Sequence, residues 1–546
     1  MEDLLLVGEN ITFSETSTER SMPPNAFLDL SELVLGAVVG AGSDLILFGI
    51  GPFPVQVLSD QYSIQLHATA VDRRSMPSYG LVTAEGCDNP TSECVDSTRM
   101  IEFSDILGSV FMAEDEDGTF PEDSKQYEAL KWLSEEDNAA IPTNEEETTI
   151  IVQRYVLALV YLSTGGTRWR LSNGWMLNDS VCNWFGVTCG WTEPEADYVY
   201  ELSLANNFLK GTIPSHLGAV QSLQNIDMSQ NSVGGTVPTQ LFGLPSLEEF
   251  NLKNNDLIGT VPSFHNALNL YSLDLSANFL TGTIAPLVSP ESLSLNTLDL
   301  SSNQLIGSIP ESVYSLAFLN WLVLSSNAIT GTLSQQLGRC TNLIELDLSF
   351  TDIRGTIPTE IGQLTGLRYL SIVLSASDAG LSGTIPVEFA NLSDLWELSL
   401  GGHQFTAASL DQFVPFRSLD RLSITGSGFT STIPSEIGML TNLYSLSLEE
   451  NMLAGAIPSE LGMLAILDVL DLHQNELTGA IPTEIGLLSE LSFMDLRCNN
   501  LTGQVPTTLS RVEDPNVVCF EEGNNFALPF PEVLSGIDCD VFRGCE

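Results

Sequence analysis

The stretch that decides the fold reads Leu298-Asp-Leu-Ser-Ser-Asn303-Gln-Leu-Ile-Gly-Ser-Ile-Pro310. Two leucines around one polar residue predict a short strand whose side chains alternate between the core and solvent. The asparagine then turns the chain inward, and its amide can satisfy backbone groups of neighbouring segments that would otherwise be buried without partners. The Gly-Ser-Ile-Pro segment predicts the return path, because glycine permits the bend and proline tolerates a position that needs no hydrogen-bond donor.

The same frame recurs along the chain at intervals of about 24 residues. Its asparagine position is occupied by Asn207, Asn231, Asn255, Asn278, Asn303, Asn327, Asn451, Asn475 and Asn499. A period of this length predicts coils that each bury one face against the next coil. We therefore expect an α/β repeat solenoid of about 13 coils with a cap at each end.

The regions outside the repeats differ from them in composition. Residues 1–110 alternate short β-like runs with turns and predict a β-rich N-terminal region of unknown function. Residues 111–148 are acidic and predict a linker that contains a short helix from Gln126 to Leu133. A helical pattern and several tryptophans predict the N-terminal cap at 149–195, before the repeats at 196–505 and the C-terminal cap at 506–546.

The charge of the chain indicates which class of macromolecule it does not bind. The chain has 70 acidic and 19 basic residues, a net charge of −51, which disfavours nucleic acid. The most apolar stretch, Leu33 to Leu58, contains Asp44 and two prolines, so it predicts two β-strands rather than a membrane span. The first residues lack the pattern of a signal peptide, so we expect an incomplete N-terminus and no membrane segment evident in this chain.

The placement of the cysteines outside the middle of the chain favours an oxidising compartment, and the glycosylation sequons add little to this because four barely exceed chance. Their order along the chain suggests the pairs Cys87–Cys94, Cys182–Cys189, Cys498–Cys519 and Cys539–Cys545, with Cys340 left as a buried thiol. The sequons begin at Asn10, Asn178, Asn391 and Asn500. The spacing of cysteines and histidines predicts no metal site.

Two further features resemble a known family. The Gly-x-[Ile/Val]-Pro elements begin at Gly211, Gly235, Gly259, Gly307, Gly355, Gly383, Gly455, Gly479 and Gly503, and the lead-in reads Asn173-Gly-Trp and Cys182-Asn-Trp-Phe-Gly-Val-Thr-Cys189. From about residue 150 onward the chain resembles the plant-type leucine-rich-repeat family, which includes receptor-like proteins and polygalacturonase-inhibiting proteins. The resemblance implies a right-handed curved leucine-rich-repeat superhelix and an extracellular or cell-surface address. It also implies recognition of a peptide, glycan or protein ligand on the concave face. No kinase motif follows the repeats.

The asparagine ladder is interrupted in the middle of the repeats, where its position holds Thr351, then an irregular segment, then His403 and Ser427. The predicted ligand-binding residues in and beside this stretch are Trp321, Phe350, Tyr369, Glu397, His403 and Arg421. Aromatic residues and arginine are typical of binding hot spots. The alternative is that these repeats are degenerate and bind nothing. A second patch, Glu449, Glu450, His473 and Arg497, fits a cation, a basic peptide or ordinary surface charge.

No motif of a serine hydrolase, zinc protease, nucleotide-binding loop or dinucleotide-binding fold is present, so the sequence predicts no catalytic residue and no cofactor. We expect a non-enzymatic recognition protein, receptor-like but without a kinase. An inhibitor of wall-degrading hydrolases and a structural or adhesive cation-binding matrix protein are the alternatives, ranked only by fold-level analogy.

Overall fold

The computed structural model describes the strands between residues 4 and 66, parts of 99–110, then 123–136, 148–190 and 197–511 without 288–289, 291–292, 375–379 and 407, and finally 517–519 and 522–527. For the strands at 4–66 and 517–519, only the backbone is described. The chain divides into two compact units, Met1–Thr83 and Ala84–Glu546. Among the described residues, no helix is both long and apolar enough to cross a membrane.

The first unit holds a six-stranded antiparallel sheet with the strand order β3-β4-β1-β2-β6-β5. Its strands are β1 (Leu4–Val7), β2 (Asn10–Phe13), β3 (Ala37–Val39), β4 (Leu45–Leu47), β5 (Val55–Leu58) and β6 (Ser63–Leu66). The stretch from Leu33 to Leu58 thus carries three strands where the sequence predicts two. The cysteines at 87 and 94 and the side chain of Asn10 lie outside the described residues.

The described residues among 99–110 are helical, although the sequence predicts β-structure there. Phe103 and Leu107 are buried. They are four residues apart and therefore lie on one face of a helix, a spacing that short β-like runs do not produce.

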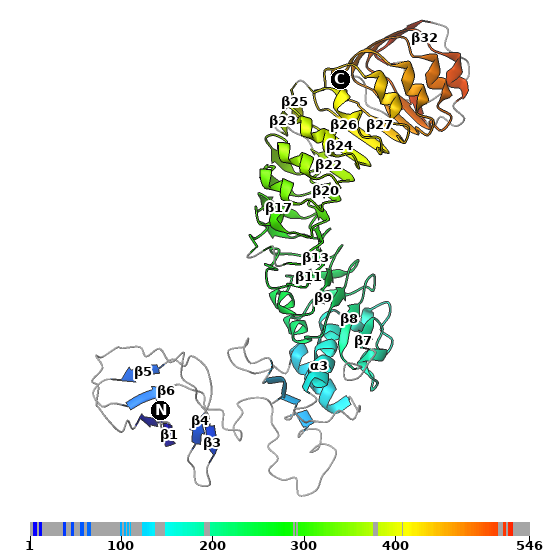
Figure 1. Cartoon of the computed structure of the whole chain (residues 1–546). Helices are drawn as coiled ribbons and strands as arrows, with labels where there is room; N and C mark the ends of the chain where they lie inside the picture. The colour runs from blue at the N-terminus through cyan, green and yellow to red at the C-terminus, as the bar shows by residue number, and fades with distance from the viewer. Residues whose placement is uncertain are drawn as a thin grey trace. The chain divides into compact units, whose positions relative to one another are not determined.

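The second unit is built on one long sheet (Figure 1), which contains fifteen strands among the described residues. The strands from β8 to β33 run parallel, and β7 pairs antiparallel with β8. They are β7 (Val187–Cys189), β8 (Val199–Ser203), β10 (Asn225–Asp227), β12 (Glu249–Asn251), β14 (Ser272–Asp274), β16 (Thr297–Asp299), β18 (Trp321–Val323), β20 (Glu345–Asp347), β22 (Tyr369–Val373), β24 (Glu397–Gly401), β26 (Arg421–Thr425), β27 (Ser445–Ser447), β29 (Val469–Asp471), β31 (Phe493–Asp495) and β33 (Val517–Cys519). One strand per coil confirms the predicted solenoid.

Short 3-10 helices form the opposite side of the coils. They are η5 (Ser215–Ala219), η6 (Thr239–Gly243), η8 (Val313–Ser315), η9 (Gln335–Arg339), η10 (Thr359–Gln363), η11 (Val387–Asn391), η12 (Leu410–Phe413), η13 (Ser435–Met439), η14 (Ser459–Met463), η15 (Thr483–Leu487) and η16 (Thr507–Arg511). Several begin directly after the proline of the Gly-x-Ile-Pro element, as η10 does after Pro358. Proline suits this place because its fixed φ fits a helix start and its missing N–H leaves no bond unmade.

A second series of strands follows the turn of most coils. They are β9 (Lys210–Thr212), β11 (Ser232–Gly235), β13 (Asp256–Leu257), β15 (Thr281–Gly282), β17 (Gln304–Gly307), β19 (Ala328–Thr332), β21 (Asp352–Arg354), β23 (Ser382–Gly383), β25 (Gln404–Phe405), β28 (Ala454–Ala456), β30 (Glu476–Gly479), β32 (Asn500–Gln504) and β34 (Asn525–Ala527). Gly307 ends β17 with φ +79°, and a Cβ there would lie 2.8 Å from Thr283 Cγ2. Both the backbone angle and the close approach of the preceding coil require glycine.

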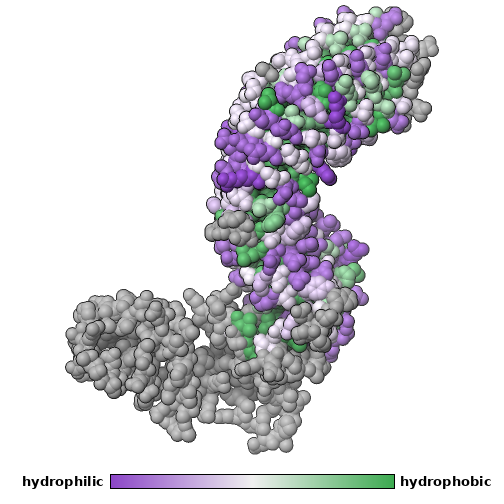
Figure 2. All heavy atoms as spheres, viewed as in Figure 1, coloured by the Kyte–Doolittle hydropathy of each residue, from purple (hydrophilic) through white to green (hydrophobic). Residues whose placement is uncertain are grey.

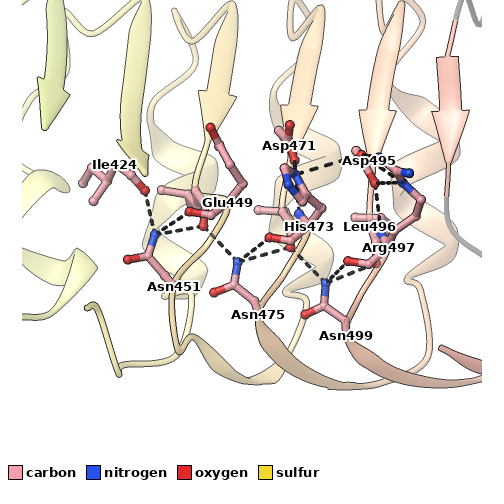
Figure 3. Close-up of polar contacts among 12 residues, drawn as sticks. Ile424, Glu449, Asn451, Asp471, His473, Asn475, Asp495, Leu496, Arg497 and Asn499 are labelled. Atoms are coloured by element: carbon pink, nitrogen blue, oxygen red, sulfur yellow. Dashed lines mark hydrogen bonds and ion pairs between the residues drawn. The ribbon is translucent and has the colours of Figure 1, made fainter. Parts of the chain in front are cut away.

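The periodic asparagines connect adjacent coils from inside the solenoid. Asn303 is representative: its Nδ2 donates to Leu275 O of the preceding coil at 3.0 Å and to Leu300 O of its own coil at 3.1 Å. Its Oδ1 accepts from Leu280 N at 2.9 Å. Figure 3 shows the same arrangement at Asn451, Asn475 and Asn499. All of these side chains are buried, so each amide serves backbone groups that water does not reach.

The N-terminal cap covers the first coil with aromatic side chains. Its helical elements are α2 (Lys125–Lys131), η1 (Trp132–Glu136), α3 (Thr148–Ser163), η3 (Gly166–Arg168) and η4 (Val181–Asn183). Trp169, Trp175 and Trp184 pack in series with centroid separations of 4.8 and 4.9 Å. Cys182 and Cys189 form a disulfide. The short helix expected at Gln126–Leu133 is α2 with η1 following it.

The remaining cysteines differ in how much of them is described. Cys498 is disulfide-bonded, and the side chain of Cys519 and residues Cys539 and Cys545 lie outside the described residues. Cys340 is a buried thiol whose Sγ lies 3.5 Å from Tyr314 O. Burial raises the pKa of this thiol to about 12, so it stays protonated at neutral pH.

Replacing Asn303 with alanine is expected to lower the free energy of unfolding by roughly 3 kcal/mol, because each buried backbone group left unpaired costs about 1–3 kcal/mol. The adjacent Gln304 is exposed, so Gln304→Ala is expected to change stability by less than about 0.5 kcal/mol. Urea unfolding followed by circular dichroism measures both variants. Equal stability losses in the two would show that the amide contributes little.

Candidate functional site

The interrupted part of the ladder uses different side chains for the same task. Thr351 Oγ1 donates only to Leu348 O of its own coil, at 2.7 Å. His403 reproduces both functions of the asparagine: its Nδ1 accepts from Leu381 N at 3.3 Å, and its Nε2 donates to Ile372 O at 2.7 Å. The side chain of His403 is 2% exposed. The structure thus places His403 inside the solenoid with both ring nitrogens engaged, and not on the concave surface where the sequence predicts ligand contact.

Longer strands accompany this change. β22, β24 and β26 each contain five residues, whereas most strands of the sheet contain three. The additional residues pair in register, with Ile372 opposite Leu400 and Val373 opposite Gly401. Backbone pairing thus takes over part of the hydrogen bonding that the asparagines provide elsewhere.

His403 is expected to make stability pH-dependent. Burial lowers the pKa of its imidazole to about 4, against about 6.5 in the unfolded chain. As the pH falls from 6.5 towards 4, the unfolded state binds a proton that the folded state does not bind. The free energy of unfolding therefore falls, by about 2 kcal/mol at pH 5. His403→Asn supplies the usual ladder residue and should remove this loss.

Urea unfolding of the wild type and His403→Asn at pH 7.5 and pH 5.0 measures the effect. His265→Asn, at a partly exposed position, is the control and should keep the wild-type pH dependence. An unchanged difference between the two pH values in His403→Asn would contradict the assignment.

Four of the predicted ligand-binding residues fall on neighbouring strands in one row of the concave face. Trp321, Tyr369, Glu397 and Arg421 begin β18, β22, β24 and β26, and Glu345 at the start of β20 completes the series. Each is the in-register partner of the next. We call these five residues the central row. Successive strands lie about 4.8 Å apart, so the side chains form a continuous surface.

Phe350 is not part of the central row. It follows β20 in the turn that leads to Thr351, with φ +55°, and its side chain is 50% exposed. The sequence therefore grouped residues from three places: the concave row, an exposed turn and the interior. Their shared feature is the irregular ladder around them, which does not specify which face of a coil a residue occupies.

A second row adjoins the central row and includes residues that the sequence did not single out. Trp396 precedes Glu397 and is 48% exposed, and Tyr444 is exposed two coils further on. The guanidinium of Arg421 lies 5.3 Å from the ring centroid of Tyr444, and its Nε lies 3.5 Å from Asp420 Oδ2 and 4.0 Å from Glu397 Oε2. In the sequence, each of these two residues is an aromatic residue directly before a strand. Without knowledge of the neighbouring coil, such a position cannot be distinguished from a loop.

Comparison with known proteins agrees with this geometry. A model described as "Leucine-rich repeat region" matches residues 292–476, and one described as "Leucine rich repeat" matches residues 197–257. The coils at residues 197–257 and 292–476 are therefore leucine-rich repeats. No curated protein matches this leucine-rich-repeat protein by sequence.

Several solved structures resemble this leucine-rich-repeat protein. The crystal structure of a TDR receptor is 29% identical with a TM-score of 0.56, and the match covers 61% of this chain and 57% of that one. The Arabidopsis receptor kinase HAESA, solved with the peptide hormone IDA and a co-receptor, is 31% identical with a TM-score of 0.49, covering 58% of this chain and 56% of that one. The leucine-rich-repeat protein thus spans less than two thirds of either receptor structure.

Carboxylates dominate the electrostatics of the central row. Burial raises the pKa of Glu345, and the neighbouring carboxylates of Asp347 and Asp299 raise it further. Burial and Asp347 also raise the pKa of Tyr369 to about 12. Burial raises the pKa of Glu397, while Arg421 opposes the shift. The row therefore presents crowded negative charge, and at Glu345 no cation offsets it in the described part of the leucine-rich-repeat protein.

The second predicted patch is only partly a cluster. His473 Nδ1 lies 2.6 Å from Asp471 Oδ1, and this hydrogen bond raises the pKa of His473. Arg497 is buried and donates to both oxygens of Asp495. Glu450 is exposed in a turn with φ +58°, outside this arrangement. The sequence placed His473 and Arg497 correctly on neighbouring coils but missed both aspartates.

Three sequon asparagines, Asn178, Asn391 and Asn500, are exposed. Asn500 begins β32 next to the buried ladder residue Asn499. These positions are open to an attached glycan, and glycosylation stays a prediction.

Proposed function

We propose that this chain is an extracellular or cell-surface recognition protein, receptor-like and without catalysis of its own, that binds a basic peptide ligand across the central row. The observation that carries the proposal is the sequence of side chains Trp321, Glu345 and Tyr369 on three adjacent strands. The Cys182–Cys189 disulfide supports the oxidising compartment. The similarity to the TDR receptor supports a receptor-type use of the fold.

The chemistry of these three side chains favours a cation. Glu345 is partly buried, and the groups that shift its pKa are burial and other carboxylates, so its charge is not neutralised by the described residues around it. Trp321 and Tyr369 stand on the strands to either side, about 10 Å apart across two strand spacings. A lysine or arginine side chain of the ligand can enter between the rings, where it gains a carboxylate partner and the faces of two aromatic rings.

Other features limit where the peptide binds. Asp274 and Asp299 are already within 3.7 and 3.9 Å of Lys253 Nζ, and Glu397 is shared with Arg421. Glu345 thus differs from these three carboxylates in lacking a basic neighbour. We therefore assign the basic side chain of the ligand to Glu345, and the adjoining Trp396 and Tyr444 to apolar contact with the rest of the peptide.

Binding of synthetic 12-residue peptides carrying +4, 0 and −4 charges tests this function by fluorescence polarisation. The +4 peptides should bind. Glu345→Gln should lower their affinity roughly tenfold, because a hydrogen-bonded charge pair contributes about 1.5–3 kcal/mol. Tyr369→Leu keeps an apolar side chain but removes the ring and should weaken binding about threefold. Affinity should also fall with rising salt concentration.

Glu249 provides a matched control, because it occupies the same in-register position on β12 but lies outside the central row. Glu249→Gln should leave binding unchanged. Equal binding of the neutral and +4 peptides, or no effect of Glu345→Gln, would reject the central row as the peptide site.

A further inference from the structure

A separate group of side chains lies near the C-terminal end of the concave face. Asp471 and His473 are two residues apart and therefore face the same side of β29, while Asp495 on β31 is the in-register partner of Asp471. His473 Nδ1 lies 2.6 Å from Asp471 Oδ1 and 4.0 Å from Asp495 Oδ2. Figure 3 shows the imidazole between the two carboxylates. One ligand atom from each residue lies within 4.8 Å of the others.

Asp495 is held in place from its other side. Arg497 donates from Nε to Asp495 Oδ1 at 3.0 Å and from Nη2 to Oδ2 at 2.6 Å. Both residues are buried. The guanidinium fixes the orientation of the carboxylate, as outer-shell partners do around metal ligands.

Glu449 lies on the neighbouring coil, outside the three residues whose ligand atoms are all within 4.8 Å of one another. It occupies the position in its coil that His473 occupies in the next one, and the two coils are joined there by the hydrogen bond from Glu450 N to His473 O at 3.1 Å. Its Oε2 is shielded from solvent and has no hydrogen-bond partner in the described part of the chain. A shielded carboxylate oxygen without a partner is costly, so positive charge near this end of the concave face would stabilise Glu449.

We propose that Asp471, His473 and Asp495 bind one divalent transition metal ion such as Zn²⁺. The ion replaces the proton on His473 Nδ1 and offsets the excess of the Asp471 and Asp495 carboxylates over the single guanidinium of Arg497. Metal–ligand bonds of about 2.0–2.2 Å place two donors of one ion at most about 4.4 Å apart, so small side-chain rotations close the site. An imidazole nitrogen among oxygens selects Zn²⁺ over Ca²⁺ or Mg²⁺, which prefer oxygen ligands throughout.

Such an ion would connect two consecutive coils, since Asp471 and His473 come from the end of β29 and the turn after it, and Asp495 comes from the end of β31. This role is distinct from peptide binding at the central row, which lies on β18 to β26.

Isothermal titration of the full-length, tag-free, metal-depleted protein with ZnCl₂ tests the site. One Zn²⁺ per chain is expected, and His473→Gln or Asp471→Asn should raise its dissociation constant at least ~10-fold, since even outer-shell changes weaken metal sites by about 10–100-fold. Zn²⁺ should also raise the melting temperature of the wild type but not that of His473→Gln. In the same titration with CaCl₂, binding should be weaker and insensitive to His473→Gln.

Asp274→Asn is the matched control, because Asp274 ends β14 as Asp471 ends β29 but has no histidine beside it. It should bind Zn²⁺ like the wild type. Circular dichroism without metal verifies that all variants fold. Absence of stoichiometric Zn²⁺ binding, equal affinity in His473→Gln, or equal loss in Asp274→Asn would each overturn the proposal.

Discussion

The structure depends on one requirement, that every backbone N–H and C=O turned into the solenoid must find a partner where water is excluded. A single asparagine per coil meets it, because a carboxamide offers both an acceptor and donors on one short side chain. Asn231 illustrates the geometry: its Oδ1 accepts from Asn207 N and Leu209 N, and its Nδ2 donates to Leu204 O of the preceding coil. The amide joins two coils, so each coil depends on its neighbour for hydrogen bonding as well as for burial of its leucines.

The same requirement explains the middle of the solenoid. A neutral imidazole also carries one donor and one acceptor, so His403 can take the place of asparagine, provided that it remains uncharged. Thr351 offers a single hydroxyl, which reaches only its own coil. There the longer pairing of β22 with β24 supplies backbone partners instead. An irregular ladder is thus a different solution to the same hydrogen-bonding problem, and irregularity alone did not identify a binding surface.

Regular stacking also determines what the concave face can do. Because the strands pair in register, equivalent positions of successive coils become neighbours although they are about 24 residues apart in the sequence. The central row and the aspartate–histidine group are both products of this arrangement. In the central row aromatic rings alternate with carboxylates, and near the C-terminal end an imidazole meets carboxylates from neighbouring coils. One scaffold can therefore carry groups of different chemistry at different coils while the backbone of each coil stays the same.

The sequence by itself determined the solenoid, its coil number and the inward asparagines, because a period of fixed length imposes the same contacts on every coil. It also indicated Trp321, Tyr369, Glu397 and Arg421, since large or charged residues stand out among the serines and aspartates at strand positions. Only the tertiary structure showed that Glu345 completes their row, that Phe350 lies in a turn and that His403 is interior. Asp471 and Asp495 were likewise indistinguishable from other acidic residues until register placed them side by side. The physical reason is that periodicity specifies which positions face inward, whereas the meeting of individual side chains depends on stacking, register and insertions between coils.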